Sequence, residues 1–173
     1  MPKKELSIKE LKKLPPHSLL RMLNKAKKFL KTNEVMINIC KEYGQDVDII
    51  DLFPTTFGDI DVSATTTKGI VTLNYKLLAD GSFDRMDFSY LIHEYQHLLD
   101  QCFGKKATKS SDDGEYLKNR FEQKAFQVQV EYIDDQFGKE HAEDYVDNLL
   151  DHHEIEKKKD RNELEEVLLE KID

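Results

Sequence analysis

Cysteine, glycine and proline are all scarce in this chain of 173 residues. The two cysteines, Cys40 and Cys102, are too few to build a disulfide framework. Seven glycines and four prolines exclude a collagen-like or Gly/Pro-rich disordered chain. No apolar run approaches the about 18 residues that a membrane-spanning helix needs, and no apolar segment follows the first lysines as in a secretory signal. We therefore expect a cytoplasmic protein that makes no membrane contact.

Charge is abundant but unevenly distributed along the chain. Residues 1–32 contain ten Lys and Arg against two Glu, a local charge of +8, whereas the net charge of the whole chain is −8. Such a basic arm has two interpretations: it binds a nucleic acid or another acidic partner, or its lysines face solvent or the protein's own acidic part. The second is favoured, because no arginine-rich or aromatic-interleaved pattern accompanies the lysines.

The first 44 residues predict a basic helical segment. Leu6 to Leu14 is typical of a short helix, which Ser7 caps with Glu10 three residues later. A second helix is expected from about Ser18, and a third from Glu34 to Tyr43, with Asn33 as its cap and Gly44 after its end.

Three runs with the composition of strands follow, separated by short connections. They predict a small sheet of about three strands, mostly antiparallel. The runs are Val47 to Phe53, Phe57 to Ala64 and Gly69 to Tyr75.

The rest of the chain predicts helices again. The expected segments are Asp84 to Phe103, Glu115 to Phe137 after a polar loop at 105–114, and Lys139 to about His153. From Glu154 the tail is rich in Glu and Lys, and its apolar stripe fits either a docked or a solvated helix. We expect a helix-rich α+β fold with a basic N-terminal segment at 1–44, a core domain at 45–153 and a charged C-terminal helix at 154–173.

The motif His93-Glu94-Tyr95-Gln96-His97 lies in the middle of the first long helix after the strands. Two histidines four residues apart share one helix face, so both imidazoles can reach one Zn²⁺. Glu94 lies about 100° further round the helix, where it can accept a proton from a water that the metal acidifies. Random placement would produce about 0.02 such motifs in a chain of this composition, which argues against coincidence. A metal-bound water beside a general base therefore predicts a hydrolase.

A catalytic zinc site needs a third protein ligand and an open position. Glu122 is the preferred candidate, because its helix can pack antiparallel to the motif helix and the small Ala125 beside it permits close approach. Asp100 is better placed to orient an imidazole than to bind the metal. Glu131 is expected to face solvent, about 180° away from Glu122 on the same helix. The alternatives that stay open are mainly Glu115, Asp100 and a C-terminal histidine.

With its H-E-Y-Q-H motif and the E-Q-K-A-F segment that begins at Glu122, the chain resembles the gluzincin group of zinc metallopeptidases, and more narrowly the compact ImmA/IrrE-like peptidases. The resemblance covers about residues 68–137 and implies a zincin-like core in which His93, His97 and Glu122 bind zinc and Glu94 is the general base. One departure is Phe126, where larger gluzincins carry an Asp, so that Asp100 or Gln129 is expected to support the ligands.

The resemblance also implies a strand that binds substrate by edge pairing, for which Gly69 to Asn74 is the best candidate. A peptidase needs a donor for the oxyanion as well. Tyr132 and His141 are slightly preferred for that role, and the other candidates are Tyr90, Tyr116, His152 and His153.

These inferences predict a zinc-dependent peptidase that hydrolyses a polypeptide substrate. Two other functions remain open. One is a non-proteolytic metal-binding or interaction protein that keeps the motif for stability, although an intact Glu94 argues against a purely structural site. The other is a nucleic-acid-associated protein that uses residues 1–32.

Overall fold

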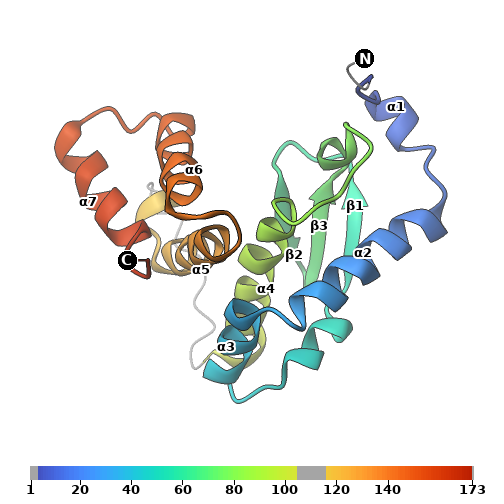
Figure 1. The fold of residues 1–173 in the computed structure, drawn as a ribbon, viewed down its shortest axis with the longest axis horizontal. Helices are drawn as coiled ribbons and strands as arrows, with labels where there is room; N and C mark the ends of the chain where they lie inside the picture. The colour runs from blue at the N-terminus through green and yellow to red at the C-terminus, as the bar shows by residue number, and fades with distance from the viewer. Residues whose placement is uncertain (1–3, 105–115, 173) are drawn as a thin grey trace.

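The computed structural model describes residues 4–104 and 116–172 of the chain. A small sheet and the helices around it form one part of the molecule, and the helices after residue 116 form the other (Figure 1). Helix α4 (Phe88–Phe103) lies between them, against strands β2 and β3 on one side and helix α5 (Arg120–Phe137) on the other. This arrangement confirms the predicted helix-rich α+β fold.

The N-terminal helices are α1 (Ile8–Leu11), α2 (Pro16–Leu30) and α3 (Glu34–Glu42). The capping prediction for α1 is confirmed, because the Ser7 hydroxyl accepts from the Glu10 N–H at 3.2 Å and the Glu10 carboxylate accepts from the Ser7 N–H at 2.7 Å. Helix α2 begins two residues earlier than expected, because Pro16 suits the first position of a helix.

The prediction of a strand at Val47 to Phe53 is wrong. These residues form a 3₁₀ helix, η1 (Val47–Leu52), which starts where the Asp46 side chain accepts a hydrogen bond from the Asp48 N–H at 2.9 Å. Strand propensity is expressed only where a neighbouring strand is available. Here strand pairing begins only at β1 (Thr55–Gly58). Leu52 is 75% exposed, so this apolar side chain of η1 is not covered by a sheet.

The sheet contains the strands β1, β2 (Ala64–Thr67) and β3 (Ile70–Asn74), in the order β1-β3-β2. The expected run from Phe57 to Ala64 is divided between the end of β1, a loop and the start of β2. β2 pairs with β3 antiparallel through a turn at Lys68-Gly69, where both residues have positive φ, whereas β1 pairs with β3 parallel. The sheet is therefore mixed and not mostly antiparallel as predicted, because β1 reaches β3 through a connection long enough to allow parallel pairing.

Strand β3 is central, so the expectation that Gly69 to Asn74 pairs with a substrate at the sheet edge is wrong. A strand that bonds neighbours on both sides has no free edge. The edge strand that lies against α4 is β2. The short 3₁₀ helix η2 (Tyr75–Leu78) follows β3.

Helix α5 starts later than expected, after the 3₁₀ helix η3 (Tyr116–Lys118). The Asn119 side chain fixes this start by accepting from the N–H groups of Phe121 at 2.9 Å and Glu122 at 3.3 Å. The polar loop predicted at 105–114, and Glu115 with it, lie outside the described residues.

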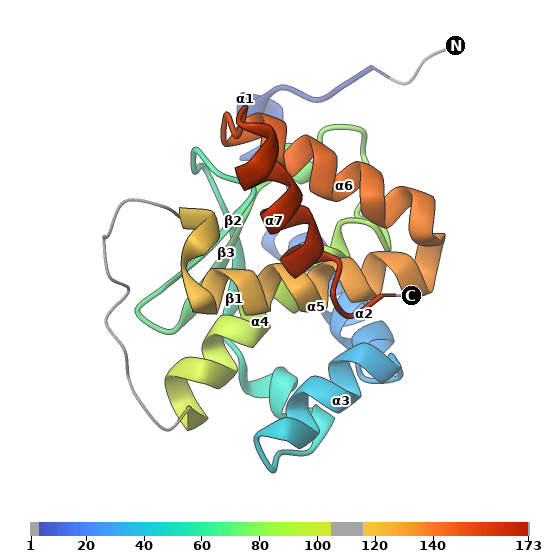
Figure 2. The ribbon, with the colours of Figure 1, turned by 90° about the vertical axis from the view of Figure 1, so that its left-hand side faces the viewer.

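Helices α6 (Lys139–His152) and α7 (Lys158–Leu168) complete the fold. The tail helix is docked: Leu164 and Leu168 are buried, and Arg161 bonds Asp147 at 2.7 Å and Asp151 at 2.8 Å. Figure 2 shows α7 crossing over α5. The buried apolar side chains form one cluster that runs from α1 to α7. The division at residues 44 and 153 stays a prediction.

Two further expectations concern contacts of the protein. In the described part of the chain, no helix is long and apolar enough to cross a membrane. Within the basic segment, Lys12 pairs with Asp59 at 2.7 Å and Lys31 with Asp51 at 2.7 Å, so part of its charge faces acidic residues of the same chain. Binding of a nucleic acid or acidic partner by residues 1–32 stays a prediction.

Candidate metal centre

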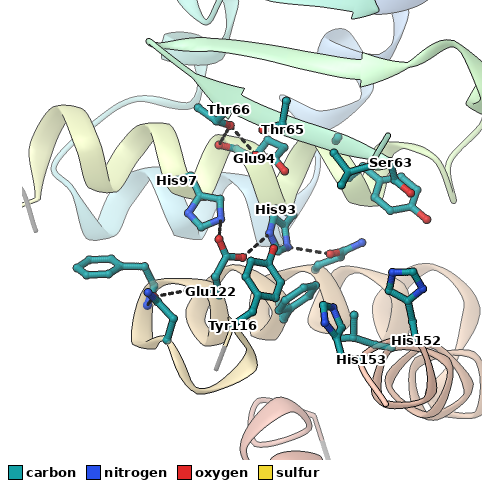
Figure 3. A pocket seen from close by; sticks show the side chains of 18 of the residues that line it. Ser63, Thr65, Thr66, His93, Glu94, His97, Tyr116, Glu122, His152 and His153 are labelled. Carbon is teal, nitrogen blue, oxygen red and sulfur yellow. Dashed lines mark hydrogen bonds and ion pairs between the residues drawn. The ribbon is translucent and has the colours of Figure 1, made fainter. Parts of the chain in front are cut away.

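Helix α4 carries the H-E-x-x-H motif between two different neighbours. His93 and His97 lie one turn apart, with ring centroids separated by 5.0 Å, on the face that packs against α5. Glu94 lies on the face toward β2, as the helical spacing predicts (Figure 3). His93 is 5% exposed and Glu94 6% exposed, so most of the motif is shielded from bulk water.

Glu122, on the first turn of α5, meets both histidines. Its Oε2 lies 3.3 Å from Nε2 of His93, and its Oε1 lies 3.0 Å from Nε2 of His97. One donor atom from each of the three side chains falls within 4.8 Å of the others, and no second such metal-binding group occurs in residues 4–104 and 116–172. The structure therefore brings together the residues that the sequence singled out.

Among the described residues, the alternative third ligands Glu131, Asp100 and a C-terminal histidine do not join this group. Glu131 lies beside a small hollow with Lys171 and Ile172, away from the motif. Asp100 lines the cavity, but its carboxylate accepts hydrogen bonds from the Tyr43 hydroxyl and from Gln96.

Charge complementarity links Glu122 to the histidines. Burial alone would raise the pKa of Glu122, but hydrogen bonds from His93 and His97 outweigh it and hold the pKa far below its usual range. Burial alone would lower the pKa of His97, but the hydrogen bond with Glu122 raises it above its usual value. The three side chains form an electrostatically coupled cluster.

The tetrahedral donor spacing of zinc provides a test of fit. Zinc with ligand bonds of about 2.0–2.1 Å in a tetrahedron separates its ligand atoms by about 3.3 Å. The carboxylate of Glu122 approaches the imidazoles through different oxygens, at 3.0 and 3.3 Å, and one donor atom from each of the three side chains lies within 4.8 Å of the others, so one ion can reach all three side chains. Two imidazoles and one carboxylate are also a donor set that zinc prefers. The three residues could therefore hold a metal ion, and their donor types suit zinc.

Gln129, one of the two residues expected to support the ligands, contacts His93. Its Oε1 lies 3.0 Å from Nδ1 of His93, and its amide nitrogen donates to the Ser89 hydroxyl at 3.2 Å. The second contact orients the amide so that its oxygen faces the imidazole. Phe126 packs edge-on against the His93 ring, with centroids 4.4 Å apart. Asp100, the other expected support, instead joins Tyr43 and Gln96.

A cavity of about 790 Å³ opens beside these residues. One wall is β2 with the loop before it, and the other is formed by η3, α5 and the end of α6, where Tyr116 and His153 stack with ring centroids 5.2 Å apart (Figure 3). Tyr90 and His152 also line it.

Tyr132 and His141, the preferred oxyanion donors, do not lie at the cavity as expected. The Tyr132 hydroxyl donates to the Arg85 carbonyl at 2.7 Å, and the His141 ring contacts Phe137. Neither side chain lines the cavity. Both follow Glu122 in the chain, but their contacts are with Arg85 and Phe137, which sequence position alone does not reveal.

Sequence reasoning missed Thr66, whose hydroxyl donates to Oε2 of Glu94 at 2.6 Å. It also missed Tyr43, whose hydroxyl accepts from Gln96 at 2.8 Å and from Lys124 at 2.7 Å, and so connects α3, α4 and α5. Both contacts join residues that are far apart in the chain, and no local pattern marks them.

Comparison of the chain with family models, curated proteins and solved structures finds no match to any of them.

Proposed function

We propose that this protein is a zinc-dependent peptidase of the gluzincin type. The observation that carries the proposal is the convergence of His93, His97 and Glu122 beside Glu94 at the wall of a cavity of about 790 Å³. A purely structural zinc site has four protein ligands and no use for a neighbouring base. A metal-dependent hydrolase needs three protein donors, an adjacent carboxylate as base and an open cavity for substrate, and all three features are present.

Each residue of the group has a distinct role in this proposal. His93, His97 and Glu122 would hold the zinc ion, which supplies a Lewis acid when bound. Glu94 takes a proton from the attacking water and returns it to the amine that leaves. The oxygen of the attacked peptide carbonyl becomes negatively charged and needs a hydrogen-bond donor. Tyr116 is the best-placed hydroxyl for this role, because it lies beside Glu122 and His153 (Figure 3).

The substrate is a polypeptide that pairs with the outer edge of β2. This edge lies along the cavity, and Ser63, Ala64, Thr65 and Thr66 line it. An extended peptide adds to such an edge through its own backbone groups, largely independent of its side chains. Strand β2 therefore takes the role that the sequence assigned to Gly69 to Asn74.

The test compares wild type with Glu94→Gln, using mass spectrometry for bound metal and a mixed peptide library for hydrolysis. We expect both proteins to bind one zinc ion per chain. We expect the variant to lose at least about 100-fold in cleavage rate, because an amide cannot accept the proton. A wild type that binds zinc and cleaves no peptide would refute the peptidase and favour a metal-binding interaction protein.

A further inference from the structure

We propose that Thr66 is a positioning residue that holds the carboxylate of Glu94 in place for proton transfer. This inference rests on the proposed peptidase function. The Thr66 hydroxyl donates to Oε2 of Glu94 at 2.6 Å, which is within the normal range for an O–H···O hydrogen bond.

The proton of this hydroxyl is committed to the carboxylate. The other acceptor near Thr66 Oγ1 is the backbone carbonyl of Glu94, at 3.5 Å, which is too long to compete. Glu94 is 6% exposed, so bulk water has little access to replace the contact. With Oε2 held by Thr66, Oε1 is the oxygen that remains to accept a proton from water.

The register of the sheet gives Thr66 a second role. The Asn74 N–H donates to the Ser63 carbonyl at 2.9 Å, and residues of an antiparallel pair alternate between bonding the partner strand and facing away from it. Ser63, Thr65 and Thr67 therefore direct their backbone groups toward β3. Ala64 and Thr66 direct theirs toward the free edge of β2.

One residue thus serves both the substrate and the base. A peptide that pairs with the edge of β2 bonds the backbone of Thr66, while the hydroxyl of the same residue fixes Glu94 (Figure 3). The scissile bond and the proton acceptor are then positioned relative to the same point of the backbone. Such shared positioning keeps reacting groups within the small tolerance that proton transfer requires.

The test uses the zinc-loaded full chain with Thr66→Val, which removes the hydroxyl and keeps a β-branched side chain. Thr66→Ala is a second variant without the hydroxyl, and Thr66→Ser restores it. Thr72→Val is the matched control, because Thr72 lies on the central strand and does not line the cavity. The measurements are kcat and KM on a library peptide, bound zinc, and a high-resolution crystal structure of each protein.

We expect Thr66→Val and Thr66→Ala to lower kcat by about 10- to 100-fold, with KM and bound zinc unchanged. Their crystal structures should show the Glu94 carboxylate displaced or in several conformers. Thr66→Ser should recover most of kcat, and Thr72→Val should match the wild type.

An undisturbed Glu94 carboxylate in both hydroxyl-free variants would overturn the proposal, and so would a displaced carboxylate with wild-type kcat. If the wild type cleaves no peptide, the peptidase function fails. The crystal structures then still decide whether Thr66 positions Glu94.

Discussion

Helices α4 and α5 both supply the candidate metal centre, but in different ways. Helix α4 provides His93, Glu94 and His97 from five consecutive residues, so their relative placement follows from helical geometry alone. Helix α5 provides Glu122 from its first turn, and that carboxylate reaches the histidines only because the two helices pack together. A short motif therefore fixes a local set of ligands, whereas completion of the site depends on tertiary packing.

Removing the contribution of α5 should have the largest effect on metal binding. Glu122→Ala leaves two imidazoles as protein ligands, so we expect zinc affinity to fall by at least about 100-fold, more than for a residue that only supports a ligand. Competition with a chelator measures the affinity. Glu131→Ala is the control on the same helix, since Glu131 lies away from the motif. Equal zinc affinity for both variants would contradict the role of Glu122.

The support that α5 gives to α4 can be removed separately. Gln129→Met fills a similar volume but offers no acceptor to Nδ1 of His93, so zinc affinity should fall by about 10- to 100-fold. Gln127→Met is the control, because Gln127 bonds α7 through the Val167 carbonyl. The same chelator assay measures both, and an unchanged affinity for Gln129→Met would show that the contact does not orient His93.

The packing between the helices is open to a direct test. Ala125 is fully buried and lies one turn from both Glu122 and Gln129 on α5. We expect Ala125→Leu to lower the free energy of unfolding by about 1–3 kcal/mol, because added methyl groups force packed elements apart. Urea denaturation measures the change. A variant as stable as the wild type would show that this position has room to spare.

The smallest expected effect is on the pH dependence of the free energy of unfolding, through Asp87 at the start of α4. Burial, aided by the nearby charges of Asp84 and Asp80, raises the pKa of Asp87 to about 6. A carboxyl with a raised pKa binds its proton more tightly in the folded state, so its contribution to stability is complete below about pH 4 and is lost as the pH rises through about 6.

Asp87→Asn cannot ionise, so the variant does not lose stability as the pH rises through about 6. The group is partly exposed, so the variant should gain no more than about 1 kcal/mol in free energy of unfolding at pH 7 and nothing at pH 4. Urea denaturation at both pH values tests this. A gain that is the same at both would contradict the assignment to ionisation of Asp87.

Much of the fold follows from local sequence. The cap at Ser7, the cap at Asn33 and the long helices of the motif region all agree with their sequence signals, because caps and apolar periodicity act within a few residues. The run at Val47 to Phe53 shows where such reasoning stops. Its composition suits a strand, but within the described residues it pairs with no strand, and it forms a 3₁₀ helix.

Local sequence is enough to define the motif of α4, the spacing of its two imidazoles and the position of Glu94 around the helix. The tertiary structure decided that Glu122 meets them, that β2 and not β3 forms the free edge, and that Thr66 and Gln129 contact Glu94 and His93. The physical reason is range. Helical geometry relates residues one turn apart, whereas strand order and helix packing depend on contacts between segments that the chain brings together only on folding.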